Sequence, residues 1–195
     1  MDAPAPLAAD ILAFWFGSPD APSGNTARDV WFRKDAAFDA GIRDRFGDAT
    51  AVALAGGYGE WCATARNSLA RVLLLDQFTR NIHRDTPAAF AGDARALATA
   101  EYAIERGFDH ELDYYGRWFL YLPFEHAEDR DMQQRSLALF GALERETGTT
   151  GPLEWAQKHA DVIARFGRYP HRNAILGRVS TPEEVAFLAQ PGSRF

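Results

Sequence analysis

The sequence contains little cysteine, little lysine and no long apolar run, and each shortage excludes a class of protein. Cys62 is the only cysteine among 195 residues, so no internal disulfide can form and a reducing compartment is expected. No apolar stretch approaches the roughly 20 residues that a membrane-spanning helix needs. The opening MDAPAPLAAD carries acidic residues and no basic region, which is unlike a signal peptide. We therefore expect a cytoplasmic protein with no membrane partner.

Positive charge is also scarce. The 21 basic residues face 27 acidic ones, and the net charge of −6 argues against nucleic acid as a partner. Only Lys34 and Lys158 are lysines, and the remaining basic residues are arginines. This bias has two interpretations that the sequence leaves open. It reflects either the codon usage of the genome or a set of arginines that bind carboxylates through two parallel hydrogen bonds, which lysine does poorly.

Apolar residues, by contrast, are abundant and helically spaced. Hydrophobic residues make up 47% of the chain and aromatic residues 13%, enough for one packed domain over residues 1–195. No β alternation is found. Asp35 is placed to cap a helix that Gly47 would end, and Thr181 is placed to cap another, with Glu184 completing a capping box. Helices are expected over 6–16, 35–47, 64–81, 94–106, 114–122, 131–146 and 152–166 and from 181 onward, with a short alanine-rich helix after Gly47. The sequence thus predicts an all-α domain of antiparallel helix pairs joined by short loops.

Residues 114–129, YYGRWFLYLPFEHAED, carry the most informative pattern. Their first half is apolar nearly all round, which is typical of a helix buried on most sides. Pro123 then predicts a kink or a new helix start, because proline lacks the backbone N–H and clashes with the preceding turn. Carboxylates in the first turns of a new helix would be stabilised by the helix dipole, and those three or four residues apart would share one face. The ionisable residues after the proline are Glu125, His126, Glu128 and Asp129.

Three separated segments end apolar helices in polar residues of complementary charge. If these ends converge, arginines and carboxylates would pair in a partly desolvated cleft. That cleft would be either a structural ion-pair network or a small-molecule site. The segments contain Asp76, Gln77, Arg80 and Asn81; Glu125, His126, Glu128 and Asp129; and Arg165, Arg168, His171, Arg172 and Asn173.

The five histidines have different expected environments. His126 lies between carboxylates, which predicts either a charged imidazole of raised pKa or a histidine satisfied within an ion network. His159 lies on an apolar helical face, where a hydrogen-bonded core histidine is more common than a catalytic base. His171 lies in a loop beside arginines and suits contacts with anions. His83 and His110 are expected at the surface.

Metal, nucleotide and nucleophile motifs are absent from the sequence. Neither the paired Glu-x-x-His spacing of di-iron bundles nor the His-Glu-x-x-His spacing of zinc proteases occurs. No glycine-rich phosphate loop follows a strand, and there is no Gly-x-Ser-x-Gly motif. Cys62, next to Trp61, is expected to be a buried small apolar residue. We expect no metal and no cofactor.

Four long segments resemble those of a known family. WFRKDAAFD, LLLDQFTRNIHRDTPAAFAGD, FLYLPFEHAEDRDMQQRSLALF and IARFGRYPHRNAILGRVSTPEEVAFL are similar to the marker segments of the DUF924 family of bacterial proteins, and the match covers nearly the whole chain. The resemblance implies a tetratricopeptide-like (TPR-like) or α-solenoid-like helical array. It implies no activity, because the family is of uncharacterised function.

We therefore state two hypotheses for the function. The first is a binding domain for a small anionic molecule or a peptide carboxylate, and the second is a hydrolytic or acid–base enzyme using Glu125, His126 and Glu128. If the carboxylates and arginines are paired, Glu125→Ala and Arg168→Ala should each destabilise the fold. The sequence does not determine the oligomeric state. The expected ligand-binding residues are Asp76, Gln77, Arg80, Asn81, Asp129, His159, Arg168, His171, Arg172 and Asn173.

Overall fold

The computed structural model describes residues 8–17 and 26–193. Most of these residues are helical. Within these residues there are nine α-helices, one π-helical segment and several 3₁₀ turns, and no strand. The expected all-α class is confirmed. The chain divides into two compact units, which we call unit 1 (residues 1–84 and 88–123) and unit 2 (residues 85–87 and 124–195). The TPR-like array and the single domain stay predictions.

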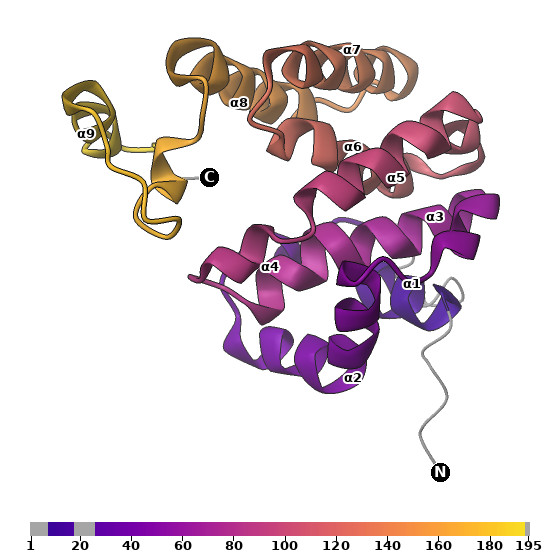
Figure 1. Ribbon diagram of the computed structural model, residues 1–195. Helices are drawn as coiled ribbons and strands as arrows, with labels where there is room; N and C mark the ends of the chain where they lie inside the picture. Colours follow the sequence, from indigo (N-terminus) through magenta and orange to yellow (C-terminus); the bar gives the residue numbers. More distant parts are fainter. Residues whose placement is uncertain (1–7, 18–25, 194–195) are drawn as a thin grey trace. The chain divides into compact units, whose positions relative to one another are not determined.

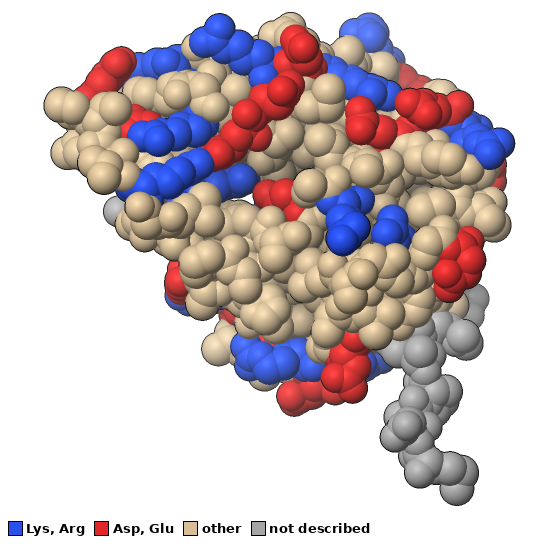
Figure 2. Space-filling model, viewed as in Figure 1, with Lys and Arg blue, Asp and Glu red and all other residues tan. Residues whose placement is uncertain are grey.

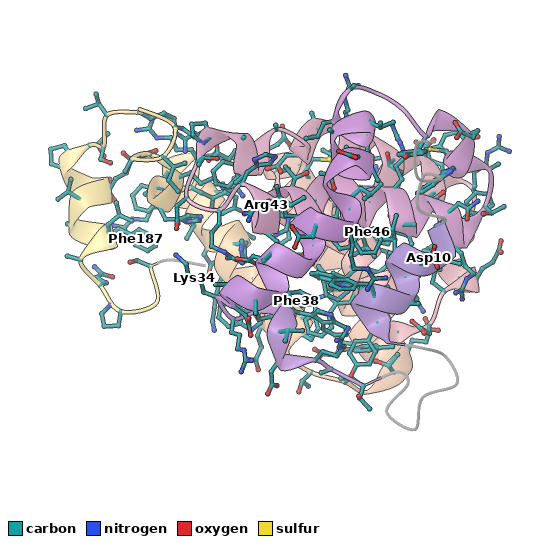
Figure 3. All side chains as sticks on the ribbon, turned by 90° about the horizontal axis from the view of Figure 1, so that it is seen from below. Asp10, Lys34, Phe38, Arg43, Phe46 and Phe187 are labelled. Atoms are coloured by element: carbon teal, nitrogen blue, oxygen red, sulfur yellow. The ribbon has the colours of Figure 1, made fainter. Side chains whose placement is uncertain are left out.

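Unit 1 is built around aromatic side chains. The ring of Phe14 stacks on Phe38 at 5.3 Å between centroids and meets Phe46 edge-on at 5.2 Å. Figure 3 shows Phe38 and Phe46 on the side of α2 that faces α1, so these rings join the two helices. The helices of unit 1, labelled in Figure 1, are α1 (Ala8–Phe16), α2 (Ala36–Leu54), α3 (Ala65–Val72), α4 (Thr79–Ile82), α5 (Asp93–Glu105) and the first part of α6 (Tyr114–His126).

Helix α2 begins as expected and ends later than expected. The carboxylate of Asp35 accepts hydrogen bonds from the backbone N–H groups of Ala37 and Phe38, both at 3.1 Å, which confirms the predicted cap. The prediction that Gly47 ends the helix is wrong, because α2 continues to Leu54 and absorbs the expected alanine-rich helix. A glycine inside a helix costs only about 1 kcal/mol, and burial of the following turn outweighs this cost.

The long helix expected over 64–81 forms with an interruption of its hydrogen-bond pattern. Between α3 and α4, residues Leu73–Phe78 form a π-helical segment. All its side chains are buried, and only Gln77 has any exposed surface, at 8%. The Thr79 hydroxyl donates to the Leu74 carbonyl at 2.9 Å and helps to satisfy the altered backbone. Gly92, the residue before α5, lies against the backbone of the π-helical segment. A Cβ atom at this position would be 2.0 Å from the Leu75 carbonyl oxygen. Only glycine therefore fits between α5 and the π-helical segment.

Unit 2 contains α7 (Arg130–Thr147), α8 (Pro152–Phe166) and α9 (Pro182–Leu188). Figure 1 shows α7 and α8 side by side and antiparallel, as the short connection between them predicts. A small core formed by Val162, Ile163 and Tyr169 packs against Phe166 and Phe187. The predicted capping box at the start of α9 is confirmed, with Thr181 and Glu184 exchanging side-chain to backbone hydrogen bonds.

Pro123 does not start a new helix, so that alternative of the prediction is wrong, whereas the kink stays a prediction. Helix α6 continues through Pro123 to His126, and Asp129 instead caps α7 by accepting from the backbone N–H groups of Asp131 and Met132 at 2.9 and 3.0 Å. Residues 119–125 are all buried, and this packing compensates for the missing backbone hydrogen bond. Glu125 therefore lies in the last turn of a helix, where the dipole does not favour a negative charge, and it shares no helix face with Asp129. Among the described residues, no helix is long and apolar enough to cross a membrane.

Candidate functional site

The predicted site residues are divided between the two units. Asp76, Gln77, Arg80 and Asn81 belong to unit 1, whereas the segments after Glu125 and after Arg168 both belong to unit 2. Two of the three segments that were expected to converge therefore come together within one unit. Convergence of the first segment with the other two stays a prediction.

In unit 1, Arg80 is held by carboxylates of its own unit. Its Nη1 donates to Oδ1 of the completely buried Asp76 at 2.9 Å and lies 2.8 Å from Oδ1 of Asp93. Gln77 donates its amide N–H to the second Asp76 oxygen at 2.6 Å. Asp93 was not predicted, although it begins a helix at a position where acidic residues are common. The Arg80 guanidinium thus supports the π-helical segment and is largely occupied.

Asn81 joins a second carboxylate of unit 1. Its side-chain N–H donates to Oδ1 of Asp39 at 2.7 Å, and Arg84 binds both oxygens of the same carboxylate at 2.8 Å. Burial raises the pKa of Asp39, but the hydrogen bonds from Arg84 and Asn81 outweigh burial and the net shift is downward. The partners are more than 40 residues apart in the sequence, so local spacing could not predict that Asp39 and Arg84 belong to this network.

In unit 2, Glu128 joins the end of α6 to the segment after α8. Arg178 binds its two oxygens at 2.6 and 2.9 Å, and the backbone N–H of Tyr169 donates to it at 2.8 Å. Burial raises the pKa of Glu128, whereas Arg178 and the Tyr169 N–H lower it, and the net shift is downward. Glu128 is therefore a structural carboxylate. It is not a proton donor at neutral pH, so this part of the predicted acid–base site is disfavoured.

Gln133 closes the end of α6 from within α7. Its amide nitrogen lies 2.9 Å from the carbonyl oxygen of Glu125, 2.8 Å from that of Ala127 and 3.0 Å from the hydroxyl of Tyr169. Those carbonyls end a helix and have no partner within it, so a side-chain donor stabilises them. The Tyr169 hydroxyl donates to the Glu125 carbonyl at 2.5 Å. Neither Gln133 nor Tyr169 was among the predicted site residues, since nothing in the local sequence indicates either contact.

Arg168 and Asn173, both predicted to bind a ligand, bind Glu184 instead. Arg168 donates from Nε and Nη2 to the Glu184 carboxylate at 2.6 and 2.8 Å, and Asn173 donates to it at 3.2 Å. These bonds from Arg168, with that from the Thr181 N–H, lower the pKa of Glu184 to about 2. The side chains that looked most suited to an anionic ligand thus bind a carboxylate of the chain itself.

Glu125 and His159 form the buried centre of unit 2. His159 Nδ1 lies 2.8 Å from the Trp155 carbonyl oxygen and 3.2 Å from Oε1 of Glu125, and both side chains are less than a tenth exposed. A carbonyl oxygen can only accept, so Nδ1 carries the proton and Nε2 is the basic nitrogen. Burial lowers the pKa of His159 to about 3, despite the opposing effect of the Trp155 carbonyl. The expected core histidine is observed, with the added feature of a carboxylate beside it.

Three further groups act electrostatically on this centre. The pKa of His159 is lowered further by His126, Arg172 and His171. Burial lowers the pKa of His171 to about 4, and Arg172, His126 and Arg178 act in the same direction while Glu128 opposes them. Arg172 is 6% exposed and its guanidinium lies over the ring of Tyr169 at 4.5 Å. His171 and His126 are half-buried, so they are the more accessible members of the cluster.

We call Glu125, His126, His159, His171 and Arg172 the histidine cluster. Its basic groups outnumber its one carboxylate, and two of its imidazoles are kept neutral by burial. Within the described residues, no group of three His, Cys, Asp or Glu side chains is arranged to hold a metal ion. Chemically, such a cluster can accept an anion together with protons.

The remaining predicted residues lie outside the cluster. Asp129 caps α7, and His110 is exposed as expected, with 71% of its side chain accessible, whereas His83 is half-buried. Cys62 is partly exposed, so its expected burial is wrong, and Arg71 Nη1 lies 3.7 Å from its sulfur. On the face of α7 to α9 visible in Figure 2, acidic and basic side chains stand next to one another, as expected where most charges are paired locally.

Comparison with known proteins supports the family resemblance. A family model described as a bacterial protein of unknown function, DUF924, matches residues 11–192. A solved structure of a protein of unknown function from Agrobacterium tumefaciens is 44% identical, with a TM-score of 0.82, over 93% of this chain and 96% of that chain. No match was found among curated proteins. The chain belongs to the DUF924 family of bacterial proteins.

Proposed function

We propose that unit 2 binds a small anionic molecule, a carboxylate or a phosphate, at the histidine cluster. The observation that carries the proposal is the cluster's composition, in which Arg172 and three imidazoles act on one another beside two carboxylates, Glu125 and the Glu128 that Arg178 already binds. A bound anion would favour protonation of the half-buried His171 and His126, and the positive charges so formed would balance it. Binding would then take up protons from solution.

Two properties of the neighbouring side chains support this narrower site over the wider cleft expected from the sequence. Arg168 and Asn173 are bound to Glu184, and Arg178 is bound to Glu128, so these donors are occupied by carboxylates. A ligand competing for them would have to break hydrogen bonds to buried or half-buried groups. His126 and His171 are half-buried, so they form the more accessible edge of the cluster.

The test is thermal stabilisation of the intact chain by inorganic phosphate, citrate and a short peptide with a free carboxylate, each compared with sodium chloride at equal ionic strength. Stabilisation by one of the three anions, lost in His171→Gln and Arg172→Gln, is expected. Calorimetry in buffers of different ionisation enthalpy should show proton uptake on binding. Arg165→Gln is the matched control, because Arg165 is 47% exposed and its ion pair is with the exposed Glu183. Equal stabilisation by sodium chloride, or an unchanged response in His171→Gln, would refute the proposal.

The contact between Glu125 and His159 favours a second candidate, acid–base catalysis with His159 Nε2 as the base. A carboxylate that holds Nδ1 while leaving Nε2 basic is the arrangement found in many hydrolases. The pKa of about 3 argues against it, because a general base works best when its pKa is near the working pH. This reasoning makes anion binding the better supported function. A hydrolytic activity on ester or phosphoester substrates that His159→Gln abolishes without unfolding the protein would reverse that order.

A further inference from the structure

Unit 1 contains a cavity whose lining includes no residue of the histidine cluster and neither Arg80 nor Arg84. Its volume is about 510 Å³, which is within the range of small-molecule sites. Its walls come from α1, from the 3₁₀ turn at Asp29–Trp31, from the start of α3 and from the turn that leads into α6. All the lining residues belong to unit 1.

Aromatic rings form one wall of this cavity. Phe16 meets Trp31 edge-on at 5.8 Å between centroids, and Trp31 meets Tyr115 at 5.4 Å. The indole N–H of Trp31 donates to the Trp15 carbonyl at 2.9 Å, and Arg28 donates to the same carbonyl at 2.6 Å. These bonds fix the Trp31 ring, so the wall is already formed without a ligand. Leucine side chains at 12, 69 and 112 add further apolar surface.

The charges around the cavity are mostly negative. Three carboxylates line it, those of Asp10, Glu111 and Asp113, against one guanidinium, that of Arg66. One oxygen of Asp113 accepts from the backbone N–H of Gly116 at 2.8 Å, which holds this carboxylate at the start of α6. Asp10 and Glu111 are exposed, so they remain available to a ligand. A cavity with aromatic walls and an acidic rim suits a molecule that is apolar and positively charged.

We propose that this cavity binds an organic cation, an ammonium group carried on an apolar body. The ammonium group would lie against the electron-rich faces of the aromatic rings, an arrangement typical of sites that bind quaternary amines. Asp10 and Glu111 would neutralise its charge, and the leucines would cover its apolar part. This ligand has the opposite charge to the one proposed for unit 2, so the two proposals are independent.

The probe for the test is phenyltrimethylammonium, with benzoate and benzyl alcohol as anionic and neutral aromatic molecules of similar size. Titration with the intact chain, followed by calorimetry and by tryptophan fluorescence, should show binding of the cation that is at least about fivefold tighter than that of either comparison molecule. The double variant Asp10→Asn/Glu111→Gln should weaken cation binding about fivefold, as expected for the loss of two exposed charge contacts. Tyr115→Leu should weaken it by a similar factor.

Asp44→Asn is the matched control, because Asp44 is an exposed carboxylate of the same unit that does not line the cavity. It should leave the affinity unchanged. Three outcomes would overturn the proposal: no binding of phenyltrimethylammonium, equal binding of benzoate or benzyl alcohol, or equal weakening by the control and the double variant. Folding of each variant is checked by circular dichroism, and the exposed positions of Asp10 and Glu111 make unfolding unexpected.

Discussion

Replacement of Glu184 by glutamine removes the charge around which the C-terminal part of unit 2 is organised. The Glu184 side chain is buried and accepts from Arg168 Nε at 2.6 Å and Nη2 at 2.8 Å, from the Thr181 N–H at 2.7 Å and from Asn173 at 3.2 Å. Glutamine has nearly the same shape, keeps one acceptor oxygen and loses the charge. The substitution therefore tests the ion pair with little change in packing.

The magnitude follows from the pKa of Glu184. Hydrogen bonds from Arg168 and the Thr181 N–H lower it from 4.5 to about 2, against the opposing effect of burial. Each pKa unit corresponds to about 1.4 kcal/mol, which sets an upper limit of about 3.5 kcal/mol. Arg168 is 29% exposed, so water screens part of this interaction. We expect Glu184→Gln to lower the free energy of unfolding by about 1–3 kcal/mol at pH 7.

The effect should depend on pH in a defined direction. A carboxylate whose pKa is lower in the folded state contributes its full stabilisation above the unfolded pKa, near 4.5, and loses it as the pH falls toward 2. Urea melts at pH 7 and at pH 2.5, followed by circular dichroism, measure this. Hydrogen exchange of residues 181–188 reports separately on α9.

Glu183→Gln is the matched control at the neighbouring position. The Glu183 side chain is 62% exposed and pairs with an arginine that is 47% exposed, so its loss should cost less than about 1 kcal/mol. Arg168→Ala should destabilise at least as much as Glu184→Gln, because it leaves the buried Glu184 charge without its main partner. Equal effects of Glu184→Gln and Glu183→Gln at pH 7, or an undiminished loss at pH 2.5, would refute the reasoning.

Three further predictions concern other contacts. Gly92→Ala should cost at least about 1–3 kcal/mol in urea melts, because its Cβ would collide with a backbone oxygen of the π-helical segment, whereas Gly59→Ala, with open space around it, should cost little. The pKa of His159 is about 3 in the folded protein, so its contribution to the free energy of unfolding is present above pH 6.5 and is lost as the pH falls. Between pH 6.5 and 4.5 this loss should amount to about 2 kcal/mol, and His159→Gln should remove it. Glu128→Gln should cost about 1–2 kcal/mol and increase hydrogen exchange around Arg178; unchanged exchange would contradict it.

The local structure of this protein was largely predictable from its sequence. The Asp35 cap and the capping box at Thr181 and Glu184 depend on contacts within four residues, and both form as predicted. Helical periodicity placed α5, α7 and α8 to within a residue or two. The errors at Gly47 and Pro123 share a cause. Both residues weaken a helix locally, and burial of the adjoining turns outweighed that weakness.

The partners of the polar residues were not predictable in the same way. Arg168 and Asn173 have the chemistry of anion-binding residues, yet their anion is Glu184, which the sequence identified only as a capping residue. The bidentate contacts of Asp39 with Arg84 and of Glu128 with Arg178 join residues 45 and 50 positions apart. Composition shows that arginines and carboxylates are available, but the tertiary fold decides which ones meet. The environment of His159 was anticipated because an apolar helical face is a local property.

The geometry of the π-helical segment sets the direction in which the residues after it point. A π-helical turn accommodates one residue more than an α-helical turn. If Leu73–Phe78 took up regular α-helical geometry with the same number of residues, everything after it would be rotated by about 100° relative to α3. Arg80 would then turn away from Asp93, and Asn81 from Asp39. The buried packing that holds the wider turn thus orients two separate carboxylate networks at once, and a substitution that lets the segment relax to an α-helix should disturb both.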